Sequence, residues 1–151
     1  MATQEVFEKA LQFVLKWEGG YSNNPNDLGG ATNKGITQNT YNAYLKAHGK
    51  PSKDVKNISL NEVRDIYYKN YWQAAKCPSM TDKFAILCFD TAVNMGVARV
   101  SEFLKAAEYK YPDKFLLARI RKYNEFAKVQ SQRGFLHGWL NRVFDLENFI
   151  R

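Results

Sequence analysis

Two acidic side chains flank the part of the sequence that is richest in glycine and asparagine. Glu18 ends an apolar N-terminal segment, and Asp27 follows nine residues later. Asp27 is the only other acid between residues 9 and 53. Two carboxyl groups on either side of a sugar bond are the usual apparatus of glycoside hydrolysis, one as acid and the other acting on water or on the sugar. The pair therefore indicates glycosidase chemistry.

The predicted surroundings of Glu18 suit an acid catalyst. A helix C-terminus carries partial negative charge, and the neighbouring rings of Trp17 and Tyr21 reduce solvation, so both effects disfavour a charged carboxylate. A carboxylic acid that keeps its proton near neutral pH can protonate a leaving-group oxygen. From position alone, however, a solvated Glu18 at a helix end and an Asx-turn Asp27 are the commoner situations.

The element before Glu18 is a predicted helix, and the one after it is not. Residues 3–18 have apolar side chains at helical spacing, with Thr3 as the cap and Gly19-Gly20 as the stop. Residues 19–36 contain five glycines, four asparagines and one proline, a composition that predicts a loop or a short β-hairpin. This segment carries Asp27 and must fold back if the two acids are to meet.

The rest of the chain is predicted to be helical. Ser59 and Glu62 form a capping box at the start of one of these helices. The helix over residues 81–95 is apolar nearly all round, which predicts a buried central position. The expected segments are 37–48, 59–75, 81–95, 98–109, 113–131 and 135–150. The sequence therefore predicts a mainly α protein with one Gly/Asn-rich insertion.

Composition limits the classes of partner. The 151 residues suit one globular domain, and the net charge of +7 favours polyanionic partners such as nucleic acid, anionic lipid or a bacterial wall. Cys77 and Cys88 are not spaced as a metal motif, and no metal or organic cofactor is expected. No segment is apolar for long enough to span a membrane, and no secretory signal is recognisable, so the chain is expected to be cytoplasmic when synthesised.

Longer motifs around the two acids are more specific than the acids themselves. The chain contains Glu18-Gly-Gly-Tyr21, then Asn24-Pro25-Asn26-Asp27-Leu28-Gly29-Gly30-Ala31-Thr32, then Gly35-Ile36-Thr37, Tyr71-Trp72 and Phe89-Asp90-x-x-Val93-Asn94-x-Gly96. This series resembles glycoside hydrolase family 108, N-acetylmuramidases of the lysozyme-like superfamily first described as secretion activators. Gly138-Trp139-x-Asn141-Arg142 resembles the peptidoglycan-binding segment often found in that family.

The resemblance implies a lysozyme-like, two-lobed helical fold with a short Gly/Asn-rich loop or β-hairpin after the first helix. Residues 1–96 would be the catalytic region. Residues 97–151 would be a helical peptidoglycan-binding-like region, packed with the first as one globular unit. The implied reaction is hydrolysis of the β-1,4 bond between N-acetylmuramic acid and N-acetylglucosamine in bacterial peptidoglycan.

The resemblance also suggests roles for single residues. Glu18 would be the general acid, and Asp27 would position or activate water with help from Thr32 or Thr37. Further side chains are expected to contact the glycan or the peptide stems, although core packing is an alternative for the aromatic residues. These substrate-binding candidates are Tyr21, Tyr71, Trp72, Asn94, Trp139, Asn141 and Arg142.

Three alternatives stay open at this point. A lytic transglycosylase would use a similar lone glutamate, and a non-catalytic wall-binding module would keep the fold without turnover. A basic nucleic-acid binder leaves the Glu18–Asp27 arrangement unexplained, and no nucleic-acid motif is present. We expect a monomeric enzyme that does not insert stably into membranes and acts on the cell wall after release. It would be a phage or prophage endolysin with a holin-type release partner, or a wall-remodelling enzyme.

Overall fold

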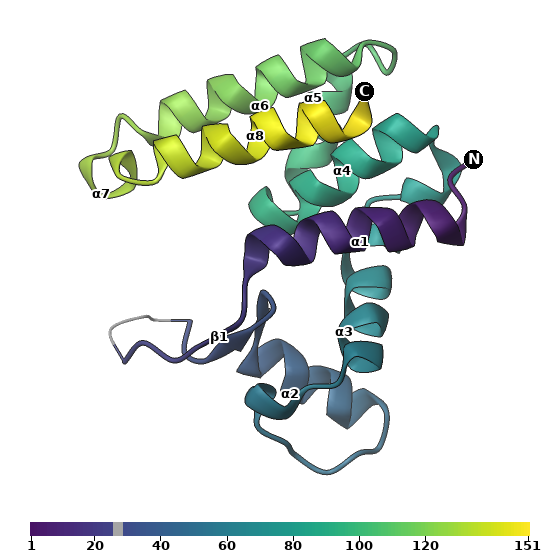
Figure 1. Cartoon of the computed structure of the whole chain (residues 1–151), viewed down its shortest axis with the longest axis vertical. Helices are drawn as coiled ribbons and strands as arrows, with labels where there is room; N and C mark the ends of the chain where they lie inside the picture. The colour runs from purple at the N-terminus through teal and green to yellow at the C-terminus, as the bar shows by residue number, and fades with distance from the viewer. Residues whose placement is uncertain (26–28) are drawn as a thin grey trace.

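The computed structural model describes residues 1–25 and 29–151 and shows a mainly α protein (Figure 1). The α-helices are α1 (Gln4–Glu18), α2 (Gln38–Ala47), α3 (Leu60–Tyr67), α4 (Asp82–Met95), α5 (Val97–Ala106), α6 (Pro112–Phe126), α7 (Gln130–Arg133) and α8 (Leu136–Ile150). The strands are β1 (Tyr21–Ser22), β2 (Thr32–Asn33) and β3 (Ile36–Thr37). The predicted fold class is confirmed.

Helix α1 begins and ends where the sequence predicts. The Thr3 side chain accepts a hydrogen bond from the backbone N–H of Val6, which satisfies one of the donors left free at a helix start. Phe7 and Val14 on one face are fully buried. Gly19, with a φ of 77°, ends the helix directly after Glu18. The glutamate is therefore fixed at the last position of a well-anchored helix.

The Gly/Asn-rich segment forms a small antiparallel sheet with strand order β1-β2-β3. The turn between β2 and β3 has only two residues, Lys34 and Gly35, between the paired Asn33 and Ile36. Their φ angles of 52° and 79° are the positive values that a two-residue turn of type I′ requires. The expected loop or hairpin is thus a three-stranded sheet in which this tight turn comes close to α1.

The helix predicted from residue 59 to 75 changes character midway. The capping box of Ser59 and Glu62 is present as expected. The α-helix ends at Tyr67, however, and the chain continues as a π-helical segment (Tyr68–Gln73). Because a π turn holds more residues than an α turn, it changes the direction of the side chains that follow. Short 3₁₀ helices occur at Val55–Asn57 and Cys77–Ser79.

Helix α4 is the centre of the molecule, as its apolar sequence predicts. Leu87, Cys88 and Phe89 are completely buried in it. The same core includes Phe103 of α5 and Phe115 of α6, so residues after 96 share it with those before. In Figure 1, α6 and α8 run side by side across one end of the molecule, with α4 between them and α1.

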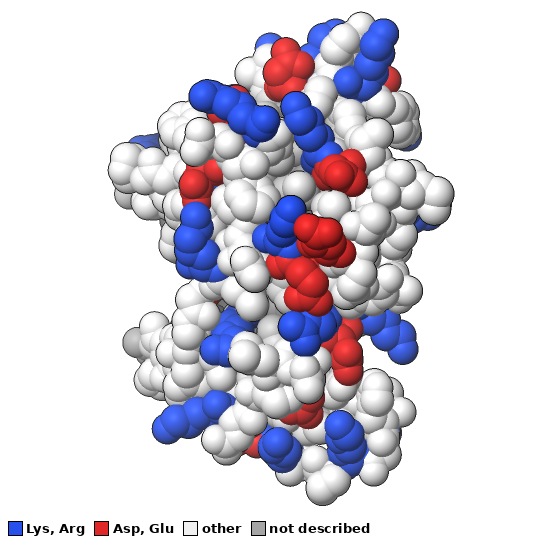
Figure 2. All heavy atoms as spheres, turned by 45° about the vertical axis from the view of Figure 1, so that its right-hand side comes forward, with Lys and Arg blue, Asp and Glu red and all other residues white. Residues whose placement is uncertain are grey.

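The molecule has two lobes, with α1 and α4–α8 in the larger one and the sheet and α2 in the smaller one (Figure 1). Helix α3 leads from one lobe to the other. On the face shown in Figure 2, acidic and basic side chains lie next to one another around the middle of the molecule. One ion pair joins α3 to α1, with the Arg64 Nε 2.8 Å from Glu8 Oε1. None of the described helices is long and apolar enough to cross a membrane.

Candidate active site around Glu18

Glu18 lies where the two lobes join, at the end of α1. Its side chain is 22% exposed, so a reacting group can approach it while most of the carboxyl stem is covered. Its Oε1 atom accepts a hydrogen bond from Nη1 of Arg142 at 3.2 Å. Arg142 belongs to α8, so the partner of this carboxylate comes from the other end of the chain.

The β2–β3 turn covers the stem of Glu18. A Cβ atom placed on Gly35 would lie 3.0 Å from Cγ and 3.1 Å from Cβ of Glu18, and it would collide with the hydroxyl of Tyr67. Tyr67 donates that hydroxyl to the carbonyl oxygen of Lys34 at 2.6 Å. Only glycine therefore fits this position, for both its φ and its surroundings. The turn holds the Glu18 stem from one side.

Two tyrosines on the α3 side are close enough to be affected by Glu18. Burial raises the pKa of Tyr67 far above its ordinary value, and the charge of Glu18 raises it further. The pKa of Tyr71 is also raised, by burial and then by Glu18. The two rings lie 5.4 Å apart. These neutral hydroxyl groups are polar without being charged, so they border the acid without neutralising it.

A buried group of charges lies behind Glu18. Arg142 donates from Nε and Nη2 to the carboxylate of Asp90, the shortest of these bonds being 2.8 Å. The other carboxylate oxygen of Asp90 lies 2.8 Å from Nη2 of Arg119. Asp90 is 1% exposed and Arg119 is 0% exposed. Burial lowers the pKa of Arg142, but the charges of Asp90 and Glu18 outweigh this effect and keep the net shift upward.

The polar contacts of Arg119 connect further side chains to this buried cluster of charges. Its Nη1 donates to Oγ1 of Thr91 and its Nε donates to the hydroxyl of Tyr123, both at 3.0 Å. Tyr123 in turn donates to Oδ1 of Asn94. Asn94 was predicted to face the substrate with its amide. Its carbonyl oxygen accepts from Tyr123 and its side chain is half-buried, and the substrate contact of Asn94 stays a prediction.

The predicted water-handling residues are placed only in part. Asp27 lies outside the described residues. Thr32 in β2 pairs with Thr37 in β3, so the two threonines are cross-strand neighbours. The hydroxyl of Thr37 caps α2, because it accepts from the N–H of Thr40 at 3.1 Å. Thr37 therefore has a structural task, whereas Thr32 is half-buried in the sheet.

The aromatic candidates fall into different environments. Tyr21 in β1 is exposed, with the Nζ of Lys56 lying 5.6 Å from its ring centroid. Tyr71 is half-buried near Glu18. Trp72 is 1% exposed and packs edge-on against Phe89. The prediction that Trp72 stacks on a sugar is wrong, because the π-helical segment directs this ring into the core.

The candidates in α8 are also separated. Trp139 is half-buried and stacks on Tyr123 with ring centroids 4.9 Å apart, and Asn141 is exposed. Arg142 was predicted to pair with a carboxylate of a peptide stem. This prediction is wrong, because Arg142 is buried and its donors serve Asp90 and Glu18. The partner is a carboxylate, as the residue type suggested, but it belongs to the protein.

The buried positions of Asp90 and Arg119 behind the acid were not predicted from the sequence. A signal was present for Asp90, since it sits in a helix that is otherwise apolar nearly all round. A carboxylate in such a position is almost never buried without a partner. The sequence did not reveal which of its many basic residues would be that partner. Among the described residues, no three His, Cys, Asp or Glu side chains gather in a way that could hold a metal ion.

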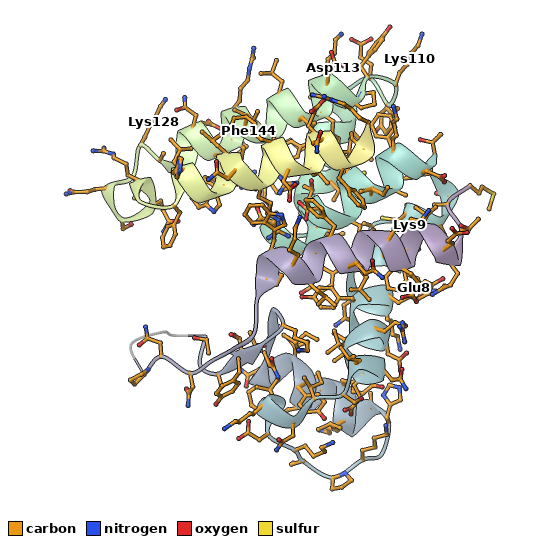
Figure 3. The ribbon with its side chains drawn as sticks, in the orientation of Figure 1. Glu8, Lys9, Lys110, Asp113, Lys128 and Phe144 are labelled. Carbon is orange, nitrogen blue, oxygen red and sulfur yellow. The ribbon has the colours of Figure 1, made fainter. Side chains whose placement is uncertain are left out.

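The described residues also form a hollow whose lining does not include Glu18. It has a volume of about 570 Å³ and lies between α6 and α8, with Asp113 and Phe144 in its wall (Figure 3). Phe144 is 58% exposed. At 100° per residue, Phe144 and Arg142 point to nearly opposite sides of α8. The hollow therefore opens on the side of α8 that faces away from Glu18.

The fold and this site define a class: a mainly α, lysozyme-like protein in which one carboxyl group at a helix end is partly exposed and the charges behind it are buried. The sequence profile of the glycosyl hydrolase 108 family matches residues 11–96. The chain belongs to this family and is a glycoside hydrolase. No curated protein matches the sequence.

Among solved structures, the chain is similar to SagA from Brucella abortus. The two have 24% sequence identity and superpose with a TM-score of 0.76 over 98% of this chain and 95% of the other. This likeness concerns the fold. It extends past residue 96, so α5–α8 belong to the shared architecture even though the family profile ends before them.

Proposed function

We propose that this protein is an N-acetylmuramidase that hydrolyses the β-1,4 bond between N-acetylmuramic acid and N-acetylglucosamine in peptidoglycan. Glu18 is the general acid in this proposal. The observation that carries it is the placement of Glu18 in a member of the glycosyl hydrolase 108 family. The carboxyl group is fixed at the end of α1 by a turn on one side and a guanidinium on the other, yet it stays partly exposed.

The proton transfer follows from this placement. The glycosidic oxygen must receive a proton as its bond to the anomeric carbon breaks, because an alkoxide is a poor leaving group. A partly exposed carboxyl group with a fixed stem can deliver that proton without reorganising. The resulting carboxylate is stabilised by the Arg142 guanidinium, whose Nη1 already donates to Oε1.

The water that completes hydrolysis is assigned to Asp27 by the same proposal. Its nine-residue distance from Glu18 in the sequence places it in the segment between β1 and β2. Thr32 is the threonine better suited to assist, because the hydroxyl of Thr37 caps α2. A carboxylate that activates water favours hydrolysis over the intramolecular reaction of a transglycosylase.

Substrate contacts are proposed for the side chains that remain available near the junction of the lobes. Tyr21 is exposed and Tyr71 is half-buried next to Glu18, so both offer ring surface to a sugar. Trp139 and Asn141 in α8 are the candidates for contacts by the C-terminal region. The net charge of +7 supports attraction to an anionic wall.

The test is digestion of purified peptidoglycan by the wild type and by Glu18→Gln, with mass analysis of the soluble products. We expect turbidity loss and reducing-end muramic acid from the wild type only. Anhydro-muramic products would assign the enzyme to the lytic transglycosylases and retain the role of Glu18. Binding to the pellet without any product would refute the enzymatic proposal and favour a wall-binding module.

Asp27→Asn separates the second role from the first. Loss of hydrolysis with normal binding to peptidoglycan is the expected result if Asp27 acts on water. Thr32→Val and Thr37→Val extend the comparison, and we expect the former to reduce turnover more. Equal activity of Asp27→Asn and the wild type would remove Asp27 from the mechanism while leaving Glu18 in place.

A further inference from the structure

The partner of the proposed acid comes from outside the segment that the family profile matches. That segment is residues 11–96, whereas Arg142 is in α8. Its guanidinium is buried and makes contacts with two carboxylates at once, Asp90 in α4 and Glu18 in α1. The guanidinium therefore joins three helices at a single point directly behind the reacting group.

The orientation of this guanidinium is fixed by Asp90. Nε and Nη2 of Arg142 both point at the Asp90 carboxylate, which leaves Nη1 directed at Glu18. Asp90 is itself held from its other side by Arg119, at 2.8 Å. Because a guanidinium is planar, two donors fixed on one carboxylate determine where the remaining nitrogen lies. The position of Nη1 relative to Glu18 is thus set by the Asp90 carboxylate.

This geometry distinguishes the two oxygens of Glu18. A guanidinium has donors only and cannot accept a hydrogen bond. An oxygen that accepts from Arg142 at 3.2 Å cannot also carry a proton directed at the same nitrogen. A hydrogen bond from a cation favours the unprotonated oxygen of a carboxylic acid as its acceptor, so with Arg142 in place the acidic proton of Glu18 is favoured on Oε2. Oε2 is the oxygen that does not accept from Arg142, so it is the one left to donate a proton.

We propose that Arg142 is a positioning residue that reserves Oε2 of Glu18 as the proton-donating atom, and that Asp90 positions Arg142 for this task. This inference rests on the proposed muramidase function. It makes the C-terminal helices part of the acid site, in addition to any contact they make with the wall. Arg142 is not a catalytic residue in this scheme, because it acts through Glu18.

The inference predicts a change in pH dependence that a purely structural role would not cause. Within the described residues, Glu18 interacts with the ionisable groups of Arg142, Tyr67 and Tyr71, and Asp90 lies behind Arg142. The tyrosines are neutral in the working range, so Arg142 is the one cation of this set. Removing it makes the charged form of Glu18 less favourable, and the acid should keep its proton to higher pH.

The experiment compares Arg142→Met and Arg142→Lys with the wild type on soluble glycan strands freed of stem peptides. We expect kcat to fall about 10- to 100-fold in Arg142→Met, the equivalent of one charge-assisted hydrogen bond, with KM within about twofold. The alkaline limb of the activity profile should move to higher pH. Arg142→Lys should restore the position of that limb and part of kcat, because it returns the cation without the fork.

Two variants serve as controls. Arg119→Met removes the other buried guanidinium on Asp90, which does not contact Glu18, so it controls for loss of stability. We expect a lower unfolding temperature and an unmoved alkaline limb. Arg151→Met changes an exposed arginine near the end of α8 that pairs with Glu147, and it should leave activity and stability unchanged. All variants are assayed well below their unfolding temperatures.

A second readout does not depend on activity. With ¹³C-labelled glutamate, the titration of the Glu18 carboxyl can be followed by NMR in the wild type and in both Arg142 variants. The midpoint should move to higher pH in Arg142→Met and return in Arg142→Lys. If Arg142→Met does not fold, Arg142→Lys becomes the decisive variant. A Glu18 titration midpoint and a kcat that both equal those of the wild type would show that the planar guanidinium is not needed.

These experiments separate failure of the Arg142 inference from failure of the proposed muramidase function. An inactive wild type refutes the muramidase, whereas active wild type with inactive Glu18→Gln establishes the acid before Arg142 is tested. Unchanged kcat and an unchanged titration in Arg142→Met would overturn the inference. An equal shift of the alkaline limb in Arg119→Met would also overturn it, since Arg142 would then act only through the fold.

Discussion

Replacing Asp90 by asparagine is expected to destabilise the protein strongly while changing its shape very little. Asp90 is 1% exposed and is the shared anion of two buried guanidiniums, those of Arg119 and Arg142. The amide keeps the size of the carboxyl group but removes the charge, and its nitrogen cannot accept from either arginine. Breaking a buried ion pair by removing one partner costs about 3–5 kcal/mol, because a charge is left uncompensated in the interior.

That range sets the size of the measurable change. For a chain of this length, each 1 kcal/mol lowers the melting temperature by about 2–4 °C, so the expected decrease is roughly 6–20 °C. Urea unfolding followed by tryptophan fluorescence should give the same loss from the shift of the midpoint, provided that the slope is unchanged. Asp145→Asn is the matched control. Asp145 accepts from Lys16 and Trp17 but is about one-third exposed, so its loss should cost no more than about 1 kcal/mol.

A cost below about 1 kcal/mol for Asp90→Asn, equal to that of Asp145→Asn, would refute the reasoning. It would mean that solvent or a rearranged side chain reaches the two arginines once the carboxylate is gone. Asp90→Leu adds a further test. If the carboxylate is required by the arginines and not by the core, the leucine variant should be at least as unstable as the asparagine variant.

Three further changes have specific expected results. Burial would raise the pKa of Glu62, but the N–H of Ser59 and other partners lower it on balance. The Glu62 carboxylate therefore stabilises the folded protein above about pH 4.5, and this stabilisation is lost as the pH falls through the lowered pKa. Glu62→Gln should cost about 1–3 kcal/mol at pH 7 and progressively less as the pH falls below about 4.5, measured by urea unfolding across that range. Gly35→Ala should cost about 1–2 kcal/mol for the positive φ alone, and the displaced Glu18 should lower peptidoglycan hydrolysis roughly 10- to 100-fold. Trp72→Ala should cost about 3–5 kcal/mol in thermal unfolding, since it empties a core position, and a cost near zero would return this ring to the substrate candidates.

The parts of the fold that local chemistry controls were predictable from sequence. The start of α1 at Thr3, the capping box of Ser59 and Glu62, and the buried position of α4 all follow from hydrogen-bond donors and apolar spacing within one helix. The three-stranded sheet was predicted only as a loop or hairpin. Its strands have two residues each, which is too few for an alternating pattern to be recognised.

The long-range contacts were not predictable in the same way. Helical periodicity shows which residues share a face, but it does not show which face of another helix lies opposite. Nothing near Arg142 in the sequence indicates that its guanidinium lies between Asp90 and Glu18. The interpretation of Trp72 failed for a related reason. The π-helical segment changes the direction of its ring by a shift that an ideal helical pattern does not include.

The 124-residue interval between Glu18 and Arg142 also has a consequence for biosynthesis. At the usual pace of about 5–20 residues per second, a ribosome needs roughly 6–25 s to proceed from one codon to the other. During that time the nascent chain already contains its acid, the hairpin that covers it and the central helix, but not the arginine that holds it. An amino-terminal fragment could fold around α1 and α4 and still be an inefficient hydrolase. A cell-free translation series arrested at successive lengths would show whether turnover appears only once α8 has emerged.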